Sequence, residues 1–178
     1  LRILYWQAAT MLNPHFGVGT TNLDASRVFY EPLAGWTQDA TLHPILAERI
    51  PSLENGDLSP EGRWVTWRIK RGVKWHDGAD FTADDVVFNW EYARNPAVAA
   101  VTSGIYNDVA IHKLDDHTVR VEFERPTPFW ADALVNSGLV PKHVFAPFNG
   151  PNSRDAPGNL RPVGTGAYRL VHFAPGDV

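Results

Sequence analysis

The stretch from Thr82 to Pro96 constrains the fold of this chain more than any other. Thr82 is followed three residues later by Asp85, which is the spacing of a helix-capping box with Asp in place of the usual Glu or Gln. Apolar residues then recur at helical spacing: Val86, Val87, Trp90 and Ala93. Pro96 cannot continue a helix. The sequence therefore predicts a helix that begins at Thr82, packs this stripe into a core and ends before Pro96.

The residues around the start of this helix also have the composition of a reactive site. RGVKWHDGADFTADD places one His and four Asp close together, and such side chains ligate metals or transfer protons. However, His76-Asp77-Gly78 is typical of a turn, and carboxylates at Asp84 and Asp85 suit the positive end of a helix dipole. The seven His of the chain are scattered, without paired metal-binding spacing. We therefore expect no catalytic residue, no metal and no cofactor here.

Two alternating segments predict an antiparallel sheet. Ser59-Pro60-Glu61-Gly62 has the residues of a type I turn, and the following strand alternates apolar with polar residues. Its apolar face would consist of Val65, Trp67 and Ile69. A second hairpin is expected around Asp115-Asp116, with Val119, Val121 and Phe123 on the buried face of the returning strand.

Shorter elements complete a mixed pattern without a regular β-α-β rhythm, which predicts an α/β or α+β fold. We expect strands over residues 1–7 and 167–173, with an extended segment near 33–37. We expect short helices over residues 24–30 and 127–135, and another after Pro141. Loops are expected over 13–22 and 149–166, the latter rich in Pro and Gly.

Composition excludes several classes of protein. The net charge of −4 argues against a nucleic-acid partner, which needs a concentrated excess of Lys and Arg. No apolar run is long enough to span a bilayer, and the absence of Cys excludes a disulfide framework. The sequence lacks the Gly-x-Ser-x-Gly motif of hydrolases and the phosphate-binding loop of nucleotide hydrolases. It also begins without a basic and apolar leader, so we expect that any export signal has been removed.

The turn-and-helix stretch itself resembles a known family. IKRGVKWHDGADFTADDVVFN is similar to the most characteristic segment of the family 5 extracellular solute-binding proteins, the peptide- and nickel-binding components of ABC importers. Other landmarks follow in family order: LNPH, YEPL, LAERI, SPEGRWVTWRI, HKLDDHTVRVEFERPTPFW, PKHVF and PVGTGAYRL. The chain departs from the family pattern at Ile50, where Trp is usual, and it is much shorter than a family member.

The resemblance implies a two-lobed, clamshell-like protein of the periplasmic-binding-protein class II type. Such a protein is not an enzyme: it binds a small solute outside the cytoplasm, in the periplasm or at the cell surface, and delivers it to a membrane ABC permease. Peptides are the commonest solutes, and a monomer is expected. Nickel complexes, oligosaccharides and opines stay open as alternatives. So does a fragment that acts only as a folding or interaction module.

The resemblance also implies a layout. Residues 1–30 would form the first segment of lobe I, residues 31–161 an additional small α/β domain, and residues 162–178 the return into lobe I, with lobe II absent. The loop after the first strand would line the ligand cleft, because Gly and Thr allow close backbone approach and supply hydroxyl donors. The implied ligand-binding residues are Gly17, Gly19, Thr20, Thr21, Asn22, Tyr106, Asn136 and Ser137. Gly164-Thr165-Gly166 would mainly serve the crossover between domains.

Overall fold

A computed structural model describes residues 7–135 and 137–175 of the chain and has a mixed α/β fold. The strand expected over residues 1–7 therefore lies almost wholly outside the described residues. The helices are α1 (Gly19–Arg27), α2 (Ala83–Arg94), α3 (Asp132–Val135) and α4 (Lys142–Phe145). The strands are β1 (Ala34–Trp36), β2 (Leu42–Pro44), β3 (Trp64–Arg68), β4 (Val109–Asp115) and β5 (Thr118–Phe123). Short 3₁₀ turns are η1 (Ser103–Tyr106), η2 (Ala146–Phe148), η3 (Ser153–Asp155) and η4 (Pro157–Asn159).

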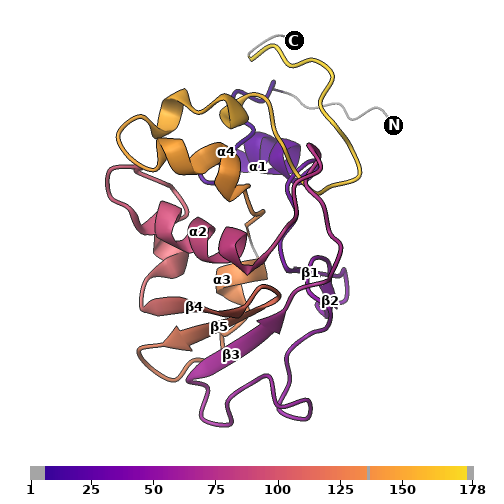
Figure 1. Cartoon of the computed structure of the whole chain (residues 1–178), viewed down its shortest axis with the longest axis vertical. Coiled ribbons are helices and arrows are strands. Elements are labelled where there is room, and N and C mark those ends of the chain that lie inside the picture. Colours follow the sequence, from indigo (N-terminus) through magenta and orange to yellow (C-terminus); the bar gives the residue numbers. More distant parts are fainter. Residues whose placement is uncertain (1–6, 136, 176–178) are drawn as a thin grey trace.

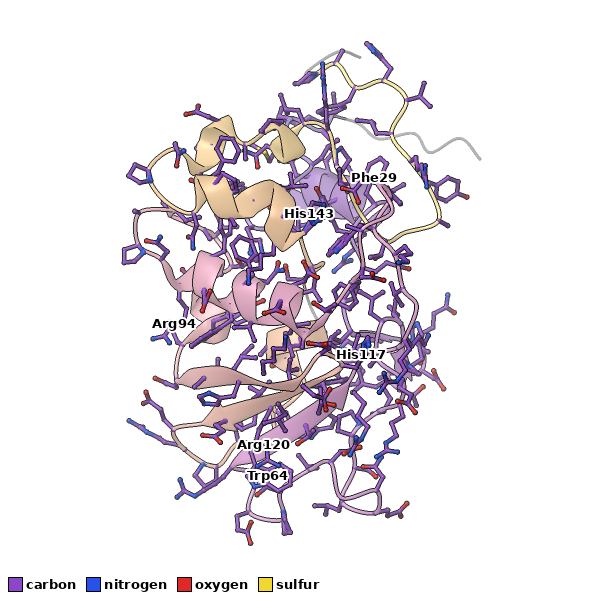
Figure 2. All side chains as sticks on the ribbon, in the orientation of Figure 1. Phe29, Trp64, Arg94, His117, Arg120 and His143 are labelled. Atoms are coloured by element: carbon purple, nitrogen blue, oxygen red, sulfur yellow. The ribbon has the colours of Figure 1, made fainter. Side chains whose placement is uncertain are left out.

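The hairpin predicted around Asp115-Asp116 is confirmed as β4-β5, and β3 pairs with β5 to complete one antiparallel sheet. The hairpin predicted over residues 59–62 is reduced to an isolated bridge between Leu58 and Val65, because no strand directly precedes this turn in the described part of the chain. The strand order of the sheet is β3-β5-β4, with Val65 opposite Val121 and Ile111 opposite Val121 on the other side. The predicted apolar face is confirmed, because Val65, Trp67 and Ile69 are buried. On the opposite face the guanidinium of Arg120 lies 4.4 Å above the ring of Trp64 (Figure 2). A separate two-stranded sheet pairs β1 with β2.

Helix α2 forms the middle layer of the molecule. In Figure 1 the three-stranded sheet lies below α2, and α1 and α4 lie on the other side of it. The predicted capping box is confirmed: Thr82 N donates to Asp85 Oδ2 at 3.0 Å, and Asp84 N donates to Thr82 Oγ1 at 3.3 Å. Because α2 is covered on both sides, its buried face is wider than the predicted stripe. Val86 and Ala93 are buried as expected, Val87 and Trp90 are half-buried, and five further residues are buried: Ala83, Asp85, Phe88, Asn89 and Tyr92.

Aromatic rings join the layers on either side of α2. The ring of Tyr92 lies 5.4 Å from that of Phe88, 6.0 Å from Phe145 of α4 and 6.2 Å from Phe16. Offset and edge contacts of this kind add to the stabilisation from apolar burial. The core therefore continues from the sheet through α2 into the layer that carries the N-terminal turn.

Two predicted helices have wrong boundaries. Helix α1 begins at Gly19 and not at residue 24, because the chain turns at Gly19 with a φ of 78° and needs no Asn or Asp cap. Helix α3 begins at Asp132 and not near Thr127. The hydroxyl of Thr127 accepts from Phe129 N at 3.0 Å, which closes a local turn that does not continue as a helix. The short helix predicted after Pro141 is confirmed as α4.

The predicted C-terminal strand is wrong for the described residues. Residues 167–173 have no strand assignment, and we find no backbone hydrogen bond to them within residues 7–135 and 137–175. Val171 is 99% exposed. An alternating sequence forms a strand only where a neighbouring strand supplies hydrogen-bond partners. The Pro- and Gly-rich segment 149–166 is a loop as predicted, interrupted by the turns η3 and η4.

Candidate ligand-facing surface

A hydrogen-bonded turn at Asn13, here called the Asn13 turn, precedes the exposed part of the predicted ligand loop and holds it in place. The side chain of Asn13 accepts from His15 N at 2.9 Å and donates to Asn159 Oδ1 at 2.8 Å. Its backbone carbonyl accepts from Gly17 N at 3.0 Å. All of these groups on Asn13, His15 and Asn159 are buried. The chain is therefore held firmly up to the point where it reaches the surface.

His15 lies within the Asn13 turn and is completely buried. Its Nδ1 lies 2.6 Å from Thr102 Oγ1, and its Nε2 lies 2.8 Å from Asn89 Oδ1. Its carbonyl accepts from Val101 N at 2.9 Å. Burial disfavours the charged imidazolium and lowers the pKa of His15 to about 4, against a smaller upward effect of the Asn89 hydrogen bond. His15 is therefore neutral at pH 7.

After the Asn13 turn the chain reaches the molecular surface at Val18, Gly19 and Thr20, which are all exposed. Val18 is the N-cap of α1, is 69% exposed and offers no side-chain acceptor to the helix. The first amide groups of α1 therefore have no side-chain cap. Such amides can donate to a carbonyl or carboxylate of a ligand. The exposed Val18 side chain adds an apolar contact beside them.

The other predicted residues of this loop have structural partners. Gly17 and Thr21 are buried. Asn22 Oδ1 accepts from Thr10 N at 2.9 Å and from Met11 N at 3.3 Å, while its Nδ2 donates to Val18 O at 3.1 Å. In this structure Asn22 thus ties the preceding segment to α1. Of the loop residues predicted from the sequence, only Gly19 and Thr20 are freely accessible.

The structure does not bring the side chains of Tyr106 and Ser137 to this surface. Tyr106 is completely buried in η1, and its hydroxyl has no hydrogen-bond partner among the described residues. Burial raises the pKa of this phenol well above its ordinary value. Ser137 is only 7% exposed, and the segment after it is held by a bond from Leu139 N to Glu31 O at 3.1 Å. Asn136 lies outside the described residues.

A hollow that sequence reasoning did not identify lies beside Ser137. It has a volume of about 370 Å³ and lies between the start of β1, the end of α1 and Gly138. Trp36, 51% exposed, contributes an aromatic surface, and Arg27 and Glu31 contribute charges of opposite sign. Single exposed residues of these types are common in any sequence. Only the folded chain brings them to one hollow.

The Gly164-Thr165-Gly166 segment is packed against the end of α1. Gly166 N donates to Phe29 O at 2.9 Å, and a Cβ on Gly164 would lie 1.9 Å from the same carbonyl oxygen. His76 secures the segment from the other side: its Nδ1 accepts from Gly164 N at 3.2 Å, and its Nε2 donates to Gly166 O at 2.7 Å. Phe29 lies beside this segment (Figure 2). The HDG turn thus holds the Gly164-Thr165-Gly166 segment in place.

Within the described ranges, no group of three or more His, Asp or Glu side chains is arranged to hold a metal ion. None of the helices in the same ranges has the length and apolar character needed to cross a bilayer.

Comparison with known proteins places the chain in context. The family model "Bacterial extracellular solute-binding proteins, family 5 Middle" matches residues 41–178. The dipeptide-binding protein of Escherichia coli is 30% identical over 90% of this chain and 33% of its own length. A di/tripeptide-binding protein of Pseudomonas aeruginosa is 30% identical over 79% of this chain and 32% of its own length. The chain thus spans about a third of the curated relatives it matches.

Solved structures agree in fold. The oligopeptide-binding protein AppA of Bacillus subtilis, solved with a nonapeptide, superposes with a TM-score of 0.85 at 22% identity over 96% of this chain and 33% of its own. NikZ of Campylobacter jejuni, solved with Ni(L-His), superposes with a TM-score of 0.76 at 26% identity over 92% of this chain and 31% of its own. These matches confirm the predicted fold class.

Proposed function

Because this chain belongs to the bacterial extracellular solute-binding proteins of family 5, we propose that it is part of the binding component of an ABC importer and that its solute is a peptide. The family comprises substrate-binding proteins that act outside the cytoplasm, and they are not enzymes. The observation that carries the choice of solute is the 30% identity to the dipeptide-binding protein of Escherichia coli over 90% of this chain.

The accessible part of the predicted loop is the proposed contact with the peptide. A peptide presents carbonyl and carboxylate oxygens along its length, and the uncapped amides at Gly19 and Thr20 are donors suited to them. Val18 provides an apolar contact for a peptide side chain. Tyr106, Asn136 and Ser137 stay proposed as ligand-binding residues; Tyr106 and Ser137 are buried and would reach the peptide only after a local rearrangement.

The proposed layout of domains follows the sequence boundaries. Residues 1–30 would belong to the first segment of lobe I, residues 31–161 to the additional small domain, and residues 162–178 to the return into lobe I. The bond between Gly166 N and Phe29 O supports this division, because it joins the two proposed lobe I segments directly. The permease partner and the monomeric state are proposals that rest on family membership.

Backbone amide NMR of the ¹⁵N-labelled chain tests the site. We expect titration with dialanine into the millimolar range to shift the amide signals of Gly19, Thr20 and Thr21. The matched control is the loop around Gly56, which is equally exposed at a positive-φ glycine and lies in the small domain. Shifts at Gly56 alone, or no shift anywhere, would contradict the proposed site.

The same titration with the nickel–histidine complex distinguishes the second candidate solute. This candidate is favoured by the likeness to NikZ, whose solved structure contains Ni(L-His). A response of Gly19 and Thr20 to dialanine but not to the nickel complex supports the peptide. The reverse pattern would replace the peptide by a metal complex while keeping the site.

A further inference from the structure

One buried amide, that of Asn89 on α2, contacts two segments far apart in the sequence. Its Nδ2 donates to Asp85 O and to Val140 O, both at 2.8 Å. Its Oδ1 accepts from Val140 N at 2.9 Å and faces His15 Nε2 at 2.8 Å. Asn89 is completely buried. The amide nitrogen therefore binds its own helix and the distant Val140, and the amide oxygen binds the distant Val140 and His15.

This arrangement fixes the form of His15. Since Asn89 Oδ1 can only accept, His15 Nε2 must carry the proton that it donates. In the neutral ring Nδ1 is then the acceptor, and it takes the hydroxyl proton of Thr102 at 2.6 Å. A second proton on Nδ1 would replace this acceptor by a donor and place a positive charge in a fully buried site.

Through His15 and Asn89, three segments are held in one arrangement. The first is the Asn13 turn, which leads directly to Val18 and Gly19. The second is the segment before Tyr106, attached through Thr102 and through the bond from Val101 N to His15 O. The third is the segment after Ser137, attached through both backbone groups of Val140. The first segment leads to the accessible peptide contact, and the other two adjoin the buried residues Tyr106 and Ser137.

The surroundings of His15 offer little to stabilise a charge. On α2 the facing titratable group is Tyr92, whose ring lies 5.5 Å away and whose pKa is raised to about 12 by burial. Asp85, one turn earlier on α2, is buried and directed to the backbone amides of Thr82 and Lys142 at 3.0 and 2.9 Å. From the C-terminal layer, Arg154 lies over the ring of Phe16 and adds positive charge.

We propose that His15 is a positioning residue whose neutral ring, with Asn89 and Thr102, holds these three segments together, and that protonation releases them as a unit. This inference rests on the proposed function for its biological meaning. Its physical content, the joint release of the three segments at acid pH, does not depend on any ligand.

The direction of the pH effect follows from the two states of the histidine. In the released state the ring regains its ordinary pKa of 6.5, whereas in the closed state the pKa is about 4. The released state therefore binds more protons between these values. The closed arrangement is fully favoured above pH 6.5 and is weakened as the pH falls towards 4. The population of the released state should rise about 30-fold between pH 7.5 and pH 5.

Hydrogen exchange of the whole 178-residue chain, corrected for the intrinsic pH dependence of exchange, measures this release. We expect the hydrogen-bonded amides of the three segments to lose about 30-fold protection together between pH 7.5 and pH 5. They include Phe16, Gly17, Val101, Ile105, Leu139 and Val140. Amides of β3 and β5 should change by less than about 3-fold, because they do not touch His15. Loss of protection at different pH values in the three segments, or to the same extent in the sheet, would overturn the proposal.

Two variants separate His15 from other acid effects. His15→Gln keeps a donor for Asn89 but cannot take up a proton, so the three segments should no longer respond to pH. His112→Gln is the matched control on the surface of β4, where the side chain is 53% exposed, and should keep the response of the unchanged chain. Should His15→Gln not fold, NMR titration of the His15 ring in the unchanged chain decides: its midpoint must coincide with that of the release.

A peptide arm distinguishes failure of this inference from failure of the proposed function. Dialanine titrations followed by the Gly19 and Thr20 amides at pH 7.5 and pH 5 should show weaker binding at the lower pH in the unchanged chain and no difference in His15→Gln. Absence of dialanine binding at both pH values would reject the proposed function. The hydrogen-exchange measurement would still show whether the three segments are released together at acid pH. Binding that weakens equally in His15→Gln would overturn the role of His15.

Discussion

Gly164 illustrates how a single hydrogen atom in place of a side chain allows two distant segments to meet. Its backbone lies directly against the carbonyl of Phe29, in a space that a methyl group cannot enter without displacing main chain. The φ angle of Gly164 is not in the left-handed region, so the requirement for glycine here is one of space. The contact joins the residues that follow α1 to the Gly164-Thr165-Gly166 segment.

We expect Gly164→Ala to lower the free energy of unfolding by about 1–3 kcal/mol, since overpacking forces a shift of the backbone. Thermal or urea unfolding of the chain measures this. The matched control is Gly104→Ala, where an added Cβ meets nothing within 4 Å and the change should stay within about 0.5 kcal/mol. Equal unfolding midpoints for the two variants would show that Gly164 is not tightly packed against Phe29 in solution.

Asp57 is a second residue whose loss should be costly. Its side chain is only 4% exposed, and Oδ2 accepts from Arg49 Nε at 2.8 Å and lies 2.6 Å from Arg49 Nη2. Oδ1 lies 3.3 Å from Arg68 Nε on β3. The carboxylate thus joins the loop before it to the edge of the sheet through two partly exposed arginines.

Asp57→Asn should therefore destabilise the chain by about 1–3 kcal/mol, because two arginines lose their charged partner and the buried amide cannot satisfy both. Asp80→Asn removes the exposed Lys74 pair and should cost less than about 1 kcal/mol. Urea unfolding at low and at high salt checks both. A larger loss for Asp80→Asn than for Asp57→Asn would mean that burial of the carboxylate does not determine the strength of the pair.

At the scale of elements, helix α2 packs against the three-stranded sheet on one side and the layer of α1 and α4 on the other. Its N-terminal cap can be tested by a single substitution. Thr82→Ala removes the hydroxyl that accepts from Asp84 N and should lower the free energy of unfolding by about 0.5–2 kcal/mol. Thr82→Ser retains the hydroxyl and should recover most of this loss. The amide shifts of Gly19 and Thr20 on adding dialanine should be the same in all three proteins. A loss of those shifts without a change of unfolding midpoint would give Thr82 a role in binding.

The success of sequence reasoning differs between elements for physical reasons. Helix α2 and the β4-β5 hairpin were predictable because their caps, turns and periodicity lie within a few residues of each other. The start of α1 was not, since Val18 provides no capping side chain and the turn depends on a glycine at positive φ. The strand expected over 167–173 depends on a partner that the pattern itself cannot supply.

The same distinction applies to the candidate site. Gly19 and Thr20 were predicted through a family resemblance, and the structure leaves them accessible. The burial of Tyr106 was not predictable, because it results from the packing of η1 against elements distant in sequence. The importance of His15 was also missed: LNPH is visible as a motif, but the contacts with Asn89 and Thr102 exist only in the folded chain.

At the scale of the whole molecule, the proposed peptide contact is a single open face. Val18 is 69% exposed, and Gly19 and Thr20 stand beside it without a facing wall in the described ranges. Specific sites usually bury about 70–90% of a small ligand's surface. A peptide lying on this face would keep much of its hydration. The chain also spans only about a third of its curated relatives.

We therefore expect the 178-residue chain by itself to bind dipeptides only in the millimolar range. Losing half of a typical binding free energy of about −8 kcal/mol leaves about −4 kcal/mol, which corresponds to a dissociation constant of about 1 mM. Calorimetric titration with dialanine and with longer alanine peptides, beside a thermal unfolding scan that verifies a folded chain, is the measurement. The folded core around Tyr92 should give a cooperative transition even without ligand. Micromolar binding by the folded chain would mean that these residues enclose a complete site, and the single-face description would then be wrong.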